Sequence, residues 1–175
     1  MAQKTQNTQE AIADMQQYIK PLNMNGLQGR MLRMPAKKGQ KREILLLYGH
    51  HASIERMFGI AEALNDFGTV TLPDLPGFGG MSSFYSIGMK PSIDNMADYL
   101  ASFIKLRYRG KKITIMGMSL GFVFATRMLQ RYPEIAKKVD LLVSIVGFSH
   151  HHDFILPKNR QRFYRYGASF FSNNL

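Results

Sequence analysis

The sequence predicts an α/β protein built on an open, mostly parallel β-sheet with helices on both faces. Short apolar runs alternate with segments of helical periodicity from residue 43 to residue 148. That order is typical of parallel strands joined by right-handed crossover helices. The chain has 175 residues, of which 45% are hydrophobic and 20% charged, so it can form one domain with a substantial core.

The N-terminal segment gives the least regular pattern. Residues 8–20 are expected to form an amphipathic helix, because their apolar side chains recur at roughly helical spacing. Residues 26–35 alternate loosely and predict a short edge strand or a hairpin arm that ends at Pro35. No apolar run approaches the roughly 20 residues that span a bilayer, and no signal-peptide pattern is present, so we expect a cytoplasmic protein without a membrane span.

The regular alternation begins with EILLLYG at residues 43–49, a short apolar run that suits a strand buried on both faces. Ser53 is expected to cap a helix that runs to about Asn65 and is closed by Gly68. The segment TVTLPD, residues 69–74, then predicts a second short strand. Together these segments predict one complete strand–helix–strand unit.

Four further segments continue the pattern. A helix is expected over residues 91–108, with Ser92 as its cap, because apolar residues recur there at helical spacing. A strand over residues 112–117 and a helix over residues 120–132 follow it. VDLLVSIVGF, residues 139–148, predicts the last strand of the alternation.

The formal net charge of +11 comes largely from three stretches without acidic residues: 30–42, 105–112 and 158–165. Such clusters occur in proteins that bind nucleic acids or anionic membranes. They lack the glycine-aromatic strand motif of an RNA-binding sheet and fall on expected helix ends and loops. A solvated basic surface is therefore the preferred interpretation, no specific nucleic-acid partner is expected, and a basic interaction protein is a further alternative. The absence of cysteine excludes disulfides, thiolate metal sites and a cysteine nucleophile.

Ser119 stands between two glycines in GMSLG, directly after an expected strand and directly before an expected helix. G-x-S-x-G in that context is the pattern of a nucleophile elbow, a sharp turn that exposes a serine hydroxyl. Gly117 and Gly121 fit this turn because side chains there would collide with the strand and the helix. The helix N-terminus would also stabilise an oxyanion. The alternative is that Ser119 is an ordinary helix N-cap.

Three loops at the expected carboxyl ends of the strands are LLLYGHHAS, DLPGFGG and GMSLG. In this order they resemble motifs of the α/β-hydrolase fold superfamily, of the serine-nucleophile esterase and lipase type, in its N-terminal part. The resemblance implies that Ser119 is the nucleophile. It also implies that the backbone amides of His50 and Leu120 form the oxyanion hole, with Gly49 in the loop that carries His50.

The same resemblance implies a reaction and no cofactor. The expected function is acyl transfer to Ser119 followed by hydrolysis of a small carboxylic ester. A serine here disfavours dehalogenases and epoxide hydrolases of this fold, which use aspartate. Asp74 would shape a turn near the site without a chemical role. Where the family usually has a histidine this chain has Tyr48, a position that mostly supports the loop.

The general base for Ser119 is the open question. The family usually supplies its acid after the sixth or seventh strand and its histidine after the eighth, whereas this chain is expected to end soon after its sixth strand. Asp153 is a candidate acid and the triplet at residues 150–152 offers a candidate base; polar loop residues are the preferred alternative for both. No metal site is expected, because neighbouring histidines in one loop cannot all face inward.

These expectations divide the chain in two. Residues 1–148 would form a partial α/β-hydrolase core, truncated after about the sixth strand, and residues 149–175 a loop and the start of a cap or lid. If the base is absent, the chain is instead a catalytically incompetent remnant or a binding module. A small-molecule ester is the expected partner, and the sequence does not determine the oligomeric state.

Overall fold

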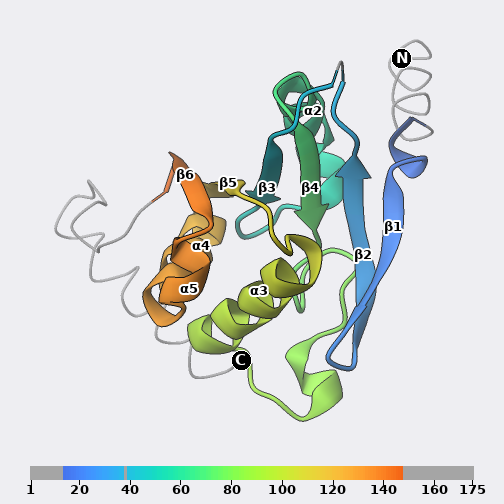
Figure 1. The fold of residues 1–175 in the computed structure, drawn as a ribbon. Helices are drawn as coiled ribbons and strands as arrows, with labels where there is room; N and C mark the ends of the chain where they lie inside the picture. The colour runs from blue at the N-terminus through green and yellow to red at the C-terminus, as the bar shows by residue number, and fades with distance from the viewer. Residues whose placement is uncertain (1–13, 38, 148–175) are drawn as a thin grey trace, which may run out of the picture.

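A computed structural model describes residues 14–37 and 39–147 (Figure 1). In this part of the chain six strands form one sheet in the order β1-β2-β4-β3-β5-β6. The strands are β1 (Ile19–Met24), β2 (Leu27–Met34), β3 (Glu43–Leu47), β4 (Thr69–Pro73), β5 (Ile113–Met118) and β6 (Val139–Ile145). The helices are α2 (Ile54–Asn65), the 3-10 helix η1 (Phe84–Ile87), α3 (Ile93–Arg107), α4 (Leu120–Arg131) and α5 (Pro133–Ala136). The α/β class and the mostly parallel sheet are confirmed.

Strands β3, β4, β5 and β6 are parallel, and their carboxyl ends therefore lie along one edge of the sheet. β3 occupies the centre between β4 and β5, and all five of its residues are buried. This burial on both faces explains why residues 44–47 form a continuous apolar run rather than an alternating one. The arrangement brings the loops after β3, β4 and β5 together at one edge.

The first two strands form a hairpin that runs antiparallel to the rest of the sheet. Asn25 (φ 53°) and Gly26 (φ 81°) both adopt left-handed backbone conformations, as a two-residue hairpin turn requires. β2 pairs with β1 on one side and β4 on the other, so the hairpin-arm prediction is correct and the edge-strand alternative is wrong. The edge is β1, which the sequence analysis did not predict.

The helix expected over residues 8–20 is wrong at its C-terminal end. Residues 14–16 are helical and are followed by β1 from Ile19, and residues 1–13 lie outside the described part. Leu22 and Met24 are buried at a spacing of two, which suits a strand paired along its whole length with β2. Pairing with a neighbouring strand thus overrides the weak helical spacing.

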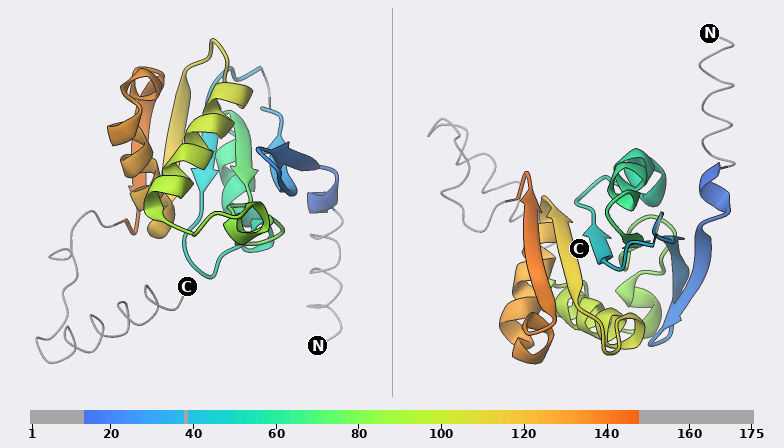
Figure 2. Two further views of the ribbon diagram at one scale, coloured as in Figure 1. Left: turned by 90° about the horizontal axis from the view of Figure 1, so that it is seen from below. Right: turned by 45° about the horizontal axis from the view of Figure 1, so that its top comes forward.

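The helices cover both faces of the sheet. α2 lies on one face, and α3 and α4 pack together on the other (Figure 2). Ser92 caps α3 as predicted, because its hydroxyl accepts a hydrogen bond from Asn95 N at 3.0 Å. Ser53 occupies the N-cap of α2 but makes no side-chain cap hydrogen bond. Helices η1 and α5 were not predicted, because each is a single turn too short to show a periodicity.

Gly68 serves a different purpose from the helix closure expected of it. α2 ends at Asn65 with Asp66 as its C-cap. A Cβ atom at Gly68 would overlap the carbonyl oxygen of Arg42, which accepts a hydrogen bond from Thr69 N at 2.9 Å. The glycine therefore allows the start of β4 to approach the chain that enters β3.

Candidate functional site

Ser119 is the residue between β5 and α4, and it has an unusual backbone conformation. Its φ of 49° and ψ of −119° lie in a region that side chains other than glycine rarely adopt. Two hydrogen bonds hold the turn: Ser119 N donates to Ile145 O, and Phe122 N donates to Ser119 O, each at 3.0 Å. A sharp strand-to-helix turn of this kind presents its serine at the carboxyl edge of the sheet.

The two glycines of GMSLG are required by packing. A Cβ atom at Gly117 would lie 2.5 Å from Phe122 Cα, inside the first turn of α4. A Cβ atom at Gly121 would lie 2.5 Å from Tyr48 O and 2.6 Å from Leu47 O, at the end of β3. All three distances are far below van der Waals contact, so only glycine allows α4 to start this close to the sheet.

The loop after β3 runs directly alongside this turn. A Cβ atom at Gly49 would lie 2.9 Å from Ser119 Cβ and 3.3 Å from Leu120 N. Ala52 N donates to Gly49 O at 3.4 Å, which closes the loop into a turn. The main chain next to His50 is thereby placed against the serine and the first residue of α4.

Two backbone amides at this junction have no internal acceptor among the described residues. Leu120 is the first residue of α4, so its N–H has no carbonyl one turn earlier to bind. The N–H of His50 makes no hydrogen bond in the described part of the chain. The His50 ring is exposed and stands edge-on to Phe78, with the ring centroids 6.0 Å apart.

Tyr48, just before this loop, is fully buried and reaches the loop after β4. Its hydroxyl donates to Asp74 Oδ1 at 2.8 Å and accepts from Leu75 N at 3.0 Å. Burial, and then the negative charge of Asp74, raise the pKa of Tyr48 far above its usual range, so the phenol stays protonated. The side chain therefore ties the residue before Gly49 to the DLPGFGG loop.

Asp74 is the centre of this connection and has no exposed surface. Its Oδ2 accepts from Arg30 Nε at 2.9 Å and from Gly80 N at 2.7 Å. Tyr99 OH donates to its backbone carbonyl at 3.1 Å. A Cβ atom at Gly79 would overlap the carboxylate, so the glycines of DLPGFGG let the loop close around it.

A second carboxylate shares the same guanidinium. Arg30 Nη1 lies 2.7 Å from Glu55 Oε1 on α2, so this guanidinium joins β2, α2 and the loop after β4. Burial lowers the pKa of Arg30, but the hydrogen bonds to Glu55 and Asp74 outweigh it and raise the pKa overall. The buried charge of Asp74 is thus paired and fully hydrogen-bonded, as a buried carboxylate must be.

The resemblance implies only that Tyr48 supports its loop and that Asp74 shapes a turn. The hydrogen bond between these two side chains is a finding of the structure. The available signal was the replacement of the family's usual histidine by tyrosine, which keeps a hydrogen-bonding group at that position. The partner could not be named, because the two residues are 26 positions apart.

A general base for Ser119 is not found in the described part of the chain. No hydrogen bond there joins Ser119 to a histidine, and His50 and His51 are both exposed. Asp153 and the histidines at residues 150–152 lie outside the described residues. In the described part no cluster of three acidic or histidine side chains could hold a metal ion. None of the helices in that part is long and apolar enough to cross a membrane.

Comparison with known proteins identifies the family. The sequence profile of the alpha/beta hydrolase fold family matches residues 43–174, and the chain belongs to this family. A comparison with curated proteins finds no match.

Several solved structures share the fold. A probable hydrolytic enzyme from Pseudomonas aeruginosa PAO1 is 24% identical with a TM-score of 0.61, over 74% of this chain and 41% of that one. A putative lipase from Acinetobacter baumannii AYE is 24% identical with a TM-score of 0.61, over 79% and 46%. A deformylase from Pseudomonas putida S16 is 21% identical with a TM-score of 0.59, over 72% and 45%. This chain thus spans less than half the length of each of these structures.

Proposed function

We propose that the protein is a serine hydrolase that transfers the acyl group of a small carboxylic ester to Ser119 and then to water. The observation that carries the proposal is the strained, positive-φ conformation of Ser119, with φ 49° and ψ −119°. Such strain persists only where the surrounding structure enforces it, and it is concentrated at functional sites. An ordinary N-cap serine has extended backbone angles instead, as Ser92 does (φ −153°, ψ 161°).

In the proposed reaction the Ser119 hydroxyl oxygen attacks the ester carbonyl carbon while its proton passes to a general base. The tetrahedral oxyanion then accepts hydrogen bonds from the amides of His50 and Leu120. Loss of one such donor typically costs about 3 to 4 kcal/mol of transition-state stabilisation. The C–O bond breaks, the alcohol leaves with the proton, and water hydrolyses the acyl-enzyme to the free acid and the serine.

The base in this proposal comes from outside the described residues. Residues 150–152, followed by Asp153, are the histidine candidates within this chain. The alternative is a binding module that retains the fold without a base. It is favoured by the absence, within the described residues, of any hydrogen bond from Ser119 to a histidine.

A fluorophosphonate probe distinguishes the two functions, because it reacts with activated serines. The expected result is labelling of one residue, identified as Ser119 by peptide mass spectrometry and lost in Ser119→Ala. Ser144→Ala is the matched control, since Ser144 pairs with Gly117 on the neighbouring strand and is exposed. Labelling must be unchanged in that control.

Substrate preference follows from a series of p-nitrophenyl esters of increasing acyl length. The proposal expects short acyl chains to give the highest kcat/KM, with no turnover by Ser119→Ala. A folded wild-type protein that neither reacts with the probe nor cleaves any ester of the series would overturn the hydrolase proposal and favour the alternative that lacks a base.

A further inference from the structure

The end of the sheet opposite Ser119 carries a concentration of positive charge. We define the basic edge as the cations that precede or begin the parallel strands: Lys41, Arg42, Arg109, Lys112, Lys137 and Lys138. Five of the six are exposed, and Lys138 is half-buried. The basic clusters at residues 30–42 and 105–112, which are far apart along the chain, both contribute to this edge.

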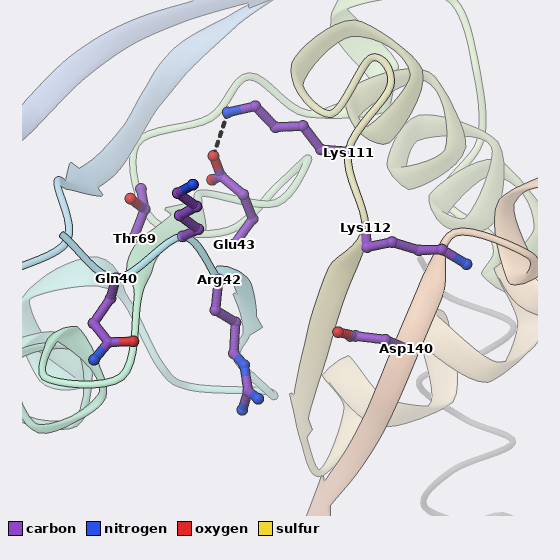
Figure 3. A pocket seen from close by; sticks show the side chains of 8 residues that line it. Gln40, Arg42, Glu43, Thr69, Lys111, Lys112 and Asp140 are labelled. Carbon is purple, nitrogen blue, oxygen red and sulfur yellow. Dashed lines mark hydrogen bonds and ion pairs between the residues drawn. The ribbon is translucent and has the colours of Figure 1, made fainter.

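Contacts show that the cations before β5 and those before β6 are neighbours. Lys112 Nζ donates to Lys137 O at 2.7 Å, and Ile113 N donates to Lys138 O at 2.9 Å. The two sides of the edge meet around a hollow of about 630 Å³. Its lining residues are Gln40, Lys41, Arg42, Glu43, Thr69, Lys111, Lys112 and Asp140 (Figure 3).

The cations of the basic edge have no carboxylate partners among the described residues, whereas many other cations of the molecule do. No ion pair in the described part of the chain involves any of the six. Nearby, Lys111 is neutralised by Glu43, and Lys37 pairs with Asp66 at 2.9 Å. Cations without an ion pair are therefore gathered at this edge, although Lys20, Lys90 and a few other exposed cations of the described residues also lack one.

A large apolar side chain stands in the same strip. Phe67 is 62% exposed and immediately precedes Gly68, which is packed against the backbone of Arg42. Asp66 on its other side holds Lys37. Phe67 thus projects from the rim of the basic edge, with cations on both sides of it.

We propose that the basic edge docks on the surface of an anionic phospholipid bilayer. Unpaired lysine and arginine side chains at such a surface attract its negative headgroups, and an aromatic side chain among them can enter the interfacial region. The observations favour a bilayer over a nucleic acid. Two carboxylates, Glu43 and Asp140, line the hollow and would repel a phosphodiester backbone that entered it, whereas a flat bilayer contacts only the rim.

Docking at this edge fixes the orientation of the molecule. The strand β5 has its first residue, Ile113, at the basic edge and ends immediately before Ser119. Six residues of strand span about 20 Å, so Ser119 would face away from the bilayer. The proposal is therefore independent of the proposed hydrolase activity and stands or falls separately from it.

The test is sedimentation of the full chain with vesicles of phosphatidylcholine alone or with 30% phosphatidylserine, at 0.05 M and 0.15 M NaCl. Each cation near an anionic surface contributes about a fivefold factor, or about 1 kcal/mol. Lys41→Gln/Arg42→Gln should thus lower the partition coefficient about thirtyfold. The matched control is Lys20→Gln/Lys90→Gln, which removes the same charge from exposed lysines elsewhere and must bind within about twofold of wild type.

Phe67→Ser provides a second, independent variant. It should weaken binding to the anionic vesicles several-fold without changing the dependence on salt, because it removes apolar contact and no charge. The proposal is overturned if the wild type does not sediment with anionic vesicles at 0.15 M NaCl. It is also overturned if the edge pair and the control pair lose binding equally. Binding of a single-stranded oligonucleotide without vesicle binding at that salt would assign the edge to nucleic acid instead.

Discussion

The hydroxyl of Tyr48 offers the sharpest test of how the candidate site is held in place. Tyr48→Phe keeps the buried ring and removes one oxygen. That oxygen donates to Asp74 Oδ1 at 2.8 Å and accepts from Leu75 N at 3.0 Å. A hydrogen bond to a charged group contributes about 1.5 to 3 kcal/mol, and a neutral one about 0.5 to 1.5 kcal/mol. We expect the variant to lose about 2 to 4 kcal/mol of unfolding free energy.

Urea unfolding measures this loss as a shift in midpoint at constant m-value. Tyr108→Phe is the control, because Tyr108 is equally buried but its hydroxyl has no hydrogen-bond partner in the described part of the chain. Its unfolding free energy should equal that of the wild type or exceed it by about 1 to 2 kcal/mol, because no bond is broken and a buried hydroxyl without a partner is removed. The difference between the two variants therefore isolates the two hydrogen bonds from the loss of a buried oxygen.

The same variant should also affect the proposed site. Releasing Tyr48 frees the residue before Gly49, whose backbone lies against Ser119. We expect the rate of fluorophosphonate labelling to fall about tenfold, less than the loss of a whole oxyanion donor. Equal stabilities for the Tyr48 and Tyr108 variants would refute the reasoning, because they would mean that the Asp74 contact contributes nothing net.

Three further predictions concern strain, packing and pH. Ser119→Gly should raise the free energy of unfolding by about 1 kcal/mol, because glycine adopts a positive φ without strain. The same variant should abolish fluorophosphonate labelling. A variant less stable than the wild type would contradict the claim that the backbone of Ser119 is strained. Gly117→Ala should lower the free energy of unfolding by about 2 to 3 kcal/mol, because the new Cβ would meet Phe122 Cα at 2.5 Å. Gly59→Ala on α2, where a Cβ meets no other atom, should raise it by about 0.5 to 1 kcal/mol. Urea unfolding measures both changes. Burial raises the pKa of Tyr48, Tyr99 and Tyr108. Above about pH 10 the unfolded chain therefore loses these phenol protons while the folded chain keeps them. The free energy of unfolding should then fall by about 1.4 kcal/mol per pH unit for each tyrosine. Tyr48→Phe should remove one such contribution from the slope, and an unchanged slope would contradict it.

The hairpin at the N-terminus illustrates the limit of local patterns. Residues 26–35 predict an edge strand or a hairpin arm, but the partner strand β1 (Ile19–Met24) begins inside the segment 8–20, whose spacing predicts a helix. A six-residue strand has few positions from which to read a period, and its stability comes from pairing with β2 rather than from its own sequence. Whether the chain from Ile19 becomes helix or strand is therefore decided only when β2 is in place.

The sequence by itself determined the α/β class, the order of strands and helices from β3 onward, and the position of Ser119 at a strand–helix junction. These features depend on local periodicity and on glycines next to one serine, which are written within a few residues of one another. The tertiary structure alone decided the rest: the pairing of Tyr48 with Asp74, and the gathering of distant cations on one edge. Both result from contacts between segments far apart in the chain, whose register depends on how the whole sheet assembles rather than on any local pattern.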